Sequence, residues 1–158
     1  MSINCVGEVL EKVSKSTKYK QRVAILREND NMVLRTMLRW MYTDIECFLP
    51  PTEPPYTPSD AVDAQGMLYS EWKKVRLSFR GEGYPSPEEL EEVARKQGTD
   101  PKTEVRRYQL IREKKFIEVL ENVDPQDALL LIKIIKREKI KNITEKLIKE
   151  AFPDVDWF

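Results

Sequence analysis

The chain has 158 residues, 41% of them hydrophobic and 34% charged, and its 27 basic residues balance its 27 acidic ones. This length suits one globular domain, and formal neutrality argues against a general electrostatic attraction to nucleic acid or anionic lipid. Two cysteines and no histidine exclude a disulfide framework and a zinc site built on histidine, and no apolar run approaches the length of a membrane span. We therefore expect reduced thiols, no metal and no cofactor.

Three amphipathic helices are predicted at the start of the chain. Apolar residues recur three and four positions apart in residues 3–13, 18–27 and 31–42, which is the spacing of one helix face. Asp30 is the expected N-cap of the third helix, because its side-chain oxygen can accept from an unpaired amide of the first turn.

Residues 43–60 are predicted to form a proline-rich strap that contains five of the ten prolines. Proline fixes φ and lacks the amide hydrogen, so neither a helix nor a central strand can run through this segment. Two interpretations stay open. The strap is either a rigid connector whose apolar side chains pack on the core, or a polyproline II segment offered to a partner through Pro54, Pro55 and Tyr56.

A single helix is predicted over residues 61–80, ended by Gly81. The run Ser86-Pro87-Glu88-Glu89 then has the form of a capping box with proline at the first helical position. It opens a short acidic helix that Gly98 ends, and we expect residues 81–101 to form a surface excursion. Carboxylates in a first turn complement the helix dipole, so a solvated face explains these glutamates better than a catalytic pair.

The last third of the chain predicts three more helices. Residues 103–122 carry the longest helical pattern, Asp124 and Pro125 start the next helix, and the nearly continuous apolar run 128–135 predicts deep burial broken only at Lys133. Asn142 and Thr144 are both possible caps for a last helix that begins at residue 145. These patterns together predict an all-α fold. It is a compact single domain, residues 1–158, of about seven helices, with the strap between its N-terminal and C-terminal helical layers.

No catalytic group can be identified, so we expect a protein that is not an enzyme. Cys5 and Cys47 lack a histidine to activate them, and no buried carboxylate stands out. Two binding surfaces are candidates. Trp157 and Phe158 close the chain with two aromatic side chains, which either pack back or join the strap residues Pro54, Pro55 and Tyr56 in binding a protein. The second candidate is a basic helix junction that could contact a phosphate backbone, although lysines at a helix end are also plain dipole partners: Lys136, Arg137, Lys139 and Lys141.

Several motifs in order resemble a family of small uncharacterised proteins of large contractile-tailed phages, including cyanophages. The segments that carry the resemblance are residues 22–30, 34–35, 48–56, 68–69, 116–128, 143–144 and 150–153. The proline strap and residues 116–128 are the most specific of these, while the insertion 81–103 is longer than the family pattern. The resemblance implies a phage origin and expression in a bacterial host cytoplasm, and it brings no functional residues with it.

These observations favour a non-enzymatic accessory protein that binds a phage or host protein in the infected cell. The alternative is an accessory protein that associates with nucleic acid through basic helices at both ends of the chain. The sequence leaves the partner and the oligomeric state open.

Overall fold

The computed structural model describes residues 5–60, 64 and 67–158, and the structural statements below concern these residues. They form an all-α fold, which confirms the prediction, with one isolated bridge between Cys47 and Phe79 in place of a sheet. A short 3-10 helix spans Arg76–Ser78. The α-helices are α1 (Val6–Lys15), α2 (Tyr19–Glu28), α3 (Met32–Tyr42), α5 (Leu68–Val75), α6 (Pro87–Gln97), α7 (Pro101–Asn122), α8 (Pro125–Ile135) and α9 (Glu145–Ala151).

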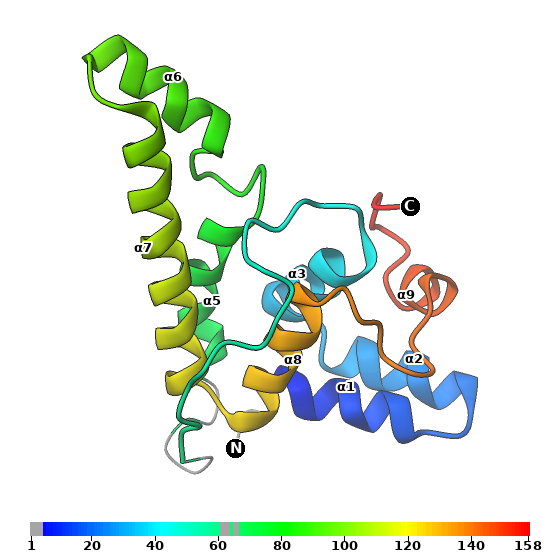
Figure 1. The fold of residues 1–158 in the computed structure, drawn as a ribbon. Helices are drawn as coiled ribbons and strands as arrows, with labels where there is room; N and C mark the ends of the chain where they lie inside the picture. Colours follow the sequence, from blue (N-terminus) through cyan, green and yellow to red (C-terminus); the bar gives the residue numbers. More distant parts are fainter. Residues whose placement is uncertain (1–4, 61–63, 65–66) are drawn as a thin grey trace.

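Helix α7 is the long axis on which one half of the molecule is built (Figure 1). Its 22 residues extend about 33 Å at 1.5 Å per residue. Helix α6 packs antiparallel on the N-terminal half of α7, and the two extend away from the rest of the molecule as a helical hairpin. Helix α5 packs on the remaining length of α7. Helices α1, α2 and α9 form the other half, and α8 contacts α1, α3 and α7 between the two halves.

Most helix starts follow local sequence signals. The side chains of Ser86, Asp124 and Thr144 each accept a hydrogen bond from an amide two or three residues ahead, as N-caps do. The prediction that Asp30 caps α3 is wrong. Asn31 is the extended residue before the helix and its Oδ1 accepts from the Leu34 amide at 2.8 Å, which leaves the Asp30 carboxylate free to pair with an arginine.

The predicted helix over residues 61–80 is wrong at its C-terminal end. Helix α5 stops at Val75, the chain tightens into the 3-10 turn, and Phe79 is extended where it pairs with Cys47. The amide of Phe48 donates to the Ser78 carbonyl at 2.7 Å, so main-chain bonds to the start of the strap replace those of a longer helix. The predicted start of this helix, at residues 61–63 and 65–66, lies outside the described residues.

The core joins the two halves through α3 and α8. Trp40 on α3 is fully buried and stacks on Phe79 with ring centroids 4.3 Å apart, and Trp72 on α5 is also buried. The predicted burial of residues 128–135 is wrong at Leu129, which is 55% exposed because it borders an open hollow between α1 and α8. No helix within the described ranges is both long and apolar enough to cross a membrane.

Candidate functional site

The strap is anchored at its N-terminal end by aromatic and main-chain contacts. Two guanidinium groups lie over the Phe48 ring, with those of Arg80 and Arg112 at 5.2 Å and 4.6 Å from its centroid. Gln109 on α7 donates from Nε2 to the Phe48 carbonyl at 2.7 Å, and the next residue, Leu49, is buried in the core. This end of the strap is therefore part of the packed body.

The C-terminal end of the strap is tied to the end of α7. The Thr57 amide donates to the Glu121 carboxylate at 2.8 Å, and the Ser59 hydroxyl donates to the carbonyl of Val123. Tyr56 lies beside these bonds, half-buried, with its ring packed against the core. The strap is therefore a clamp at both ends, while its middle is open to solvent at Pro51, Thr52 and Glu53.

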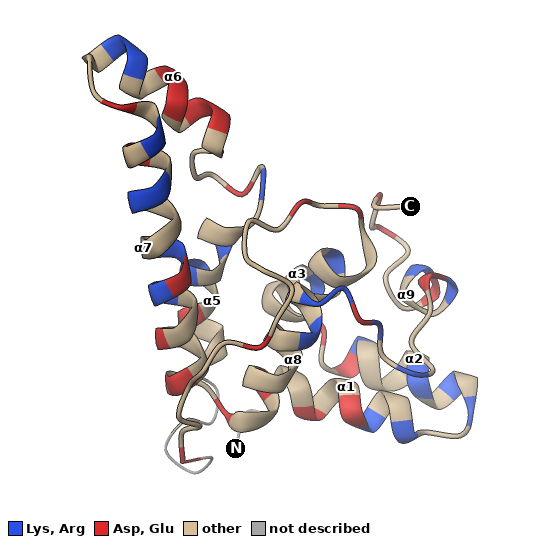
Figure 2. Cartoon of the chain, in the orientation of Figure 1, with Lys and Arg blue, Asp and Glu red and all other residues tan. Residues whose placement is uncertain are grey.

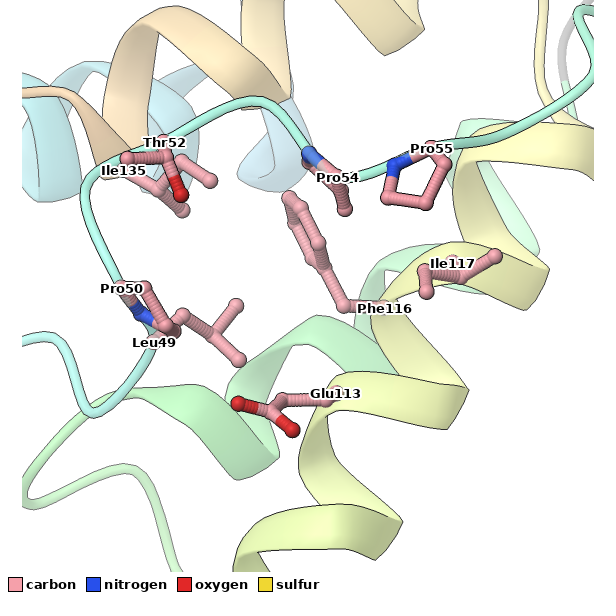
Figure 3. Close-up of a pocket in the computed structure, with 9 residues that line it drawn as sticks. All are labelled: Leu49, Pro50, Thr52, Pro54, Pro55, Glu113, Phe116, Ile117 and Ile135. Atoms are coloured by element: carbon pink, nitrogen blue, oxygen red, sulfur yellow. The ribbon is translucent and has the colours of Figure 1, made fainter.

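Between the two anchors the strap arches over an apolar pocket of about 230 Å³, which we call the strap pocket (Figure 3). Its walls come from the strap on one side and from α7 and the end of α8 on the other. The Phe116 ring points toward Pro54 across the pocket, and the Glu113 carboxylate stands at the edge near Leu49. The lining residues are Leu49, Pro50, Thr52, Pro54, Pro55, Glu113, Phe116, Ile117 and Ile135.

Pro54 and Pro55 also line a second, shallower hollow on the strap, together with Glu53, Tyr56 and Pro58. Two successive prolines hold the chain in an extended form without internal hydrogen bonds, so the rod they form keeps its shape when one face is covered. The predicted binding residues Pro54, Pro55 and Tyr56 are thus brought together around an exposed rod.

The strap pocket suits an apolar group that carries a positive charge. Aliphatic carbons, proline rings and the Phe116 ring make up most of its wall, and among the described residues that line it Glu113 alone is charged. Glu113 makes no ion pair within the described residues, so its carboxylate is available to a cation at the pocket edge. Apolar walls with a few placed polar groups are typical of binding pockets.

Trp157 and Phe158 lie apart from the strap pocket, beside α9 (Figure 1). Trp157 is half-buried and packs against the core, whereas Phe158 is 39% exposed. Their rings meet edge to face at 6.1 Å, and the Lys149 ammonium lies 5.3 Å from the Phe158 ring. The structure therefore does not combine the two predicted protein-binding segments into one pocket.

The four basic residues of the α8–α9 junction differ in their surroundings. The Arg137 guanidinium donates to the carbonyls of Trp40 and Ile45, so it is engaged in the fold. Lys136 lies 3.8 Å from the Glu138 carboxylate, and the Lys139 ammonium sits 5.5 Å from the Tyr42 ring. Lys141 has no ion pair within the described part of the chain.

Asp127 is a buried carboxylate that the sequence patterns did not single out. This residue is fully buried in the first turn of α8, and its Oδ1 accepts a hydrogen bond from the Gly7 amide at 2.6 Å. The pKa of Asp127 is raised to about 6, mainly by burial and to a smaller extent by the nearby charge of Asp124, against the lowering effect of the Gly7 bond. No signal in the local sequence distinguishes Asp127 from an ordinary first-turn carboxylate.

Cys5 faces the same buried cluster and is a structural residue. Its sulfur accepts from the Glu8 amide at 3.4 Å as the N-cap of α1, and its thiol lies 3.6 Å from the Gln126 amide oxygen. Burial raises the pKa of Cys5 to about 12, with a further contribution from the Asp127 charge, and burial also raises the pKa of Cys47. A thiol that stays protonated at neutral pH is a poor nucleophile.

The structure adds lining residues that sequence reasoning did not identify. Three of them lie on α7 and one on α8: Glu113, Phe116, Ile117 and Ile135. In the sequence, their spacing indicates only that each belongs to a helix. Their proximity to the strap depends on contacts far apart in the chain. Within the described residues, no group of three or more histidine, cysteine, aspartate or glutamate side chains could hold a metal ion.

Comparisons with known proteins gave no match: no family model, no curated protein and no solved structure matches this chain. The resemblance to small phage proteins therefore stays a prediction.

Proposed function

We propose that this protein is a non-enzymatic accessory protein of a contractile-tailed phage, which binds a phage or host protein in the host cytoplasm through the strap pocket. The observation that carries the proposal is the arrangement of the strap. Its two ends are fixed to α7, and its Pro54-Pro55 rod spans an apolar pocket whose edge carries the Glu113 carboxylate, which has no ion pair among the described residues. The phage setting rests on the sequence resemblance.

The partner segment suited to this pocket places an aliphatic or aromatic side chain under the strap and a lysine or arginine beside Glu113. The pocket volume of about 230 Å³ accommodates one large side chain. A carboxylate at the edge favours a basic residue, because an ion pair to Glu113 forms at a partly desolvated site where charge attraction exceeds that at an open surface. The rigid prolines lower the ordering cost of binding, since little chain entropy is lost.

The proposal is tested by NMR titration of the full chain with labelled methyl groups. The probes are two capped dipeptides, acetyl-leucyl-arginine amide and acetyl-leucyl-glutamine amide. We expect both to shift the methyl signals of Leu49, Ile117 and Ile135, with the arginine peptide binding more tightly. In Glu113→Gln the two peptides should bind equally, because the charge that distinguishes them is gone.

A matched pair of strap variants provides the control. Thr52→Phe places a ring at the pocket from an exposed position, whereas Thr57→Phe adds the same ring on the strap outside the lining. We expect the first to abolish the methyl shifts and the second to preserve them. The proposal fails if neither peptide shifts these methyls, or if Thr52→Phe leaves the shifts unchanged.

The nucleic-acid alternative has less support, because Arg137 is bound to two carbonyls and Lys136 lies near Glu138. It predicts that a low-salt gel shift with single- or double-stranded DNA or RNA retards the nucleic acid, and that the retardation falls steeply as salt rises. The same experiment with Lys139→Glu and Lys141→Glu shows whether this junction is responsible.

A further inference from the structure

The hollow beside Leu129 lies between α1, α8 and the loop that follows α8, and we call it the α1–α8 hollow. The two helices meet at their first turns, where the Gly7 amide donates to Asp127, and from there they run in different directions (Figure 1). The loop returns to α1, where Asn142 donates from Nδ2 to the Ser14 carbonyl at 2.7 Å. The hollow is therefore bounded on three sides. Its volume of about 450 Å³ falls within the ~300–1,000 Å³ that is typical of ligand sites.

The middle of the hollow is apolar. Leu10 and Leu130 are buried residues of its wall, and the largely exposed Leu129 borders it on α8. On α1 the lining residues extend from Gly7 to Ser14, which spans about 10 Å at 1.5 Å per residue. An apolar surface of this length suits an aliphatic chain of several carbons, because covering it removes both surfaces from water.

The polar groups at the Gln126 end of the hollow are already paired. Gln126 donates from Nε2 to the Glu11 carboxylate at 2.8 Å, and its Oε1 accepts from the Cys5 thiol at 3.6 Å. Glu11 also pairs with Lys15 at 2.7 Å. A peptide segment would find few free partners for its main-chain amides and carbonyls in this part of the hollow, whereas an aliphatic chain needs none.

The opposite end of the hollow is basic, and it is lined by Lys133 on α8 and Lys141 on the loop. Figure 2 shows blue segments at the end of α8 and along this loop. Among the described residues Lys141 makes no ion pair, and Lys133 lies 3.8 Å from Glu138 in a half-exposed and therefore weak pair. Because Glu11 is neutralised by Lys15, the charge that the hollow presents to a ligand is positive and lies at this end.

We propose that the α1–α8 hollow binds an anionic amphiphile, an aliphatic chain that ends in a carboxylate, which is the chemistry of a medium-chain fatty acid. The chain lies against Leu10, Leu129 and Leu130, and the carboxylate pairs with Lys133 and Lys141. This site is independent of the strap pocket, because the two have no lining residue in common.

NMR titration of the full chain with labelled methyl groups tests the proposal with three probes: octanoate, 1-octanol and butanoate. We expect octanoate to shift the methyl signals of Leu10, Leu129 and Leu130 and to bind roughly tenfold more tightly than octanol, which lacks the charge. Butanoate keeps the carboxylate but loses half of the chain, so it should bind more weakly than octanoate. During the octanoate titration the Ile117 and Ile135 methyls of the strap pocket should not move.

Two double variants isolate the charge. Lys133→Gln with Lys141→Gln should lower the affinity for octanoate to that for octanol, because the carboxylate loses both partners. The matched control is Lys136→Gln with Lys139→Gln, which removes the same charge from the same junction at residues outside the lining. It should keep the preference for octanoate.

A second pair of variants isolates the apolar wall. Leu129→Ser should weaken the binding of octanoate and octanol alike, whereas Leu110→Ser, at a similar exposure on α7, should weaken neither. The proposal is overturned if octanoate leaves the methyls of the hollow unshifted, if octanol binds as tightly, or if the Lys133 and Lys141 double variant keeps the preference. Tighter binding of acetyl-leucyl-aspartate amide than of octanoate at the same methyls would assign the hollow to an acidic protein segment, and this outcome also overturns the proposal.

Discussion

The amide of Gly7 donates to the carboxylate of Asp127 at 2.6 Å, across 120 positions of sequence, and this bond joins the N-terminal turns of α1 and α8. The approach is close enough that the missing side chain of Gly7 matters. A Cβ atom at Gly7 would lie 2.6 Å from the Gln126 carbonyl oxygen and 3.1 Å from the Asp127 nitrogen. Both neighbours are backbone atoms, which cannot move aside as a flexible side chain would.

Gly7→Ala is therefore expected to destabilise the protein by about 1–3 kcal/mol, the usual cost of overpacking. Helix propensity alone predicts the opposite sign, since alanine stabilises a helix interior by about 1 kcal/mol relative to glycine. Denaturant unfolding at neutral pH measures the change. Gly98→Ala is the comparison: it has open space around it and a φ of 75°, so it should cost only about 1 kcal/mol. A more stable Gly7→Ala protein would contradict the close approach.

Asp127 is expected to make stability fall as pH rises from about 4 to about 6. Burial raises the pKa of the folded carboxyl from its ordinary value of 3.8 to about 6, so the folded state holds more protons than the unfolded state within this window. At about 1.36 kcal/mol per pH unit, the stability lost across the window is about 3 kcal/mol. Asp127→Asn removes this titration and retains an oxygen that can accept from the Gly7 amide.

The measurement is the difference in unfolding free energy between Asp127→Asn and the unaltered protein across pH. We expect the variant to be more stable by about 3 kcal/mol at pH 7 and the difference to shrink toward zero near pH 4. Taking the difference matters because the Arg80 and Arg35 guanidinium groups lower the pKa values of Glu88 and Asp154, which gives the opposite pH trend in both proteins. A difference that is constant with pH would argue against a raised pKa.

Arg112 is expected to be a stability determinant at the base of the hairpin. Its fully buried guanidinium donates to the carbonyls of Leu77 at 3.0 Å and Pro85 at 2.7 Å, and it lies within 4.6 Å of the ring centroids of Phe48 and Tyr108. Burial lowers its pKa, which reflects a real desolvation cost. Arg112→Met removes the buried charge, which is favourable, but it leaves two buried carbonyls without a hydrogen-bond donor. Because the second effect is larger, we expect the free energy of unfolding to fall by about 2–4 kcal/mol.

Chemical denaturation measures the Arg112 effect, with Lys114→Met as the reference. Lys114 is exposed on the same helix, and its replacement should change stability by less than about 0.5 kcal/mol. Equal stability of the two variants would mean that charge relief offsets the lost hydrogen bonds.

Arg137 combines a strained backbone with useful side-chain bonds, and two variants can separate these effects. It follows α8 in the left-handed region, at φ 61°, where glycine is the usual residue. Arg137→Ala loses the bonds to the Trp40 and Ile45 carbonyls, whereas Arg137→Gly loses the same bonds and relieves the strain. We therefore expect the glycine variant to be about 1 kcal/mol more stable than the alanine variant in thermal or denaturant unfolding. Equal stabilities would show that this backbone carries no strain.

The helices were predictable because their signals are local. Ser86 bonds to an amide three residues ahead, as does Thr144, so each cap can be recognised within one turn of sequence. The apolar periodicity of α3 similarly follows from one helix face meeting the core. The all-α class follows from these repeated local patterns.

The features that could not be predicted depend on distant partners. Helix α5 ends early because Phe79 pairs with Cys47, more than thirty positions away. Asp127 is buried because α1 covers it, and Glu113 reaches the strap pocket only because the strap folds back across α7. Periodicity describes which face of a helix is apolar, but it does not name the segment that the face will meet.

The bonds between the two ends of the chain have a consequence for how the protein is made. Arg27 on α2 donates to the carbonyls of Glu150 and Ala151, and Arg35 on α3 pairs with Asp154 and lies over the Phe152 ring. Arg27 and Arg35 thus find these partners only after residues 150–154 have been synthesised. Helices α5, α6 and α7 meet neighbours close in sequence, so they can pack while translation continues. Helices α1 and α2 contact each other, but the face of α2 that meets α9 stays uncovered until α9 has been synthesised.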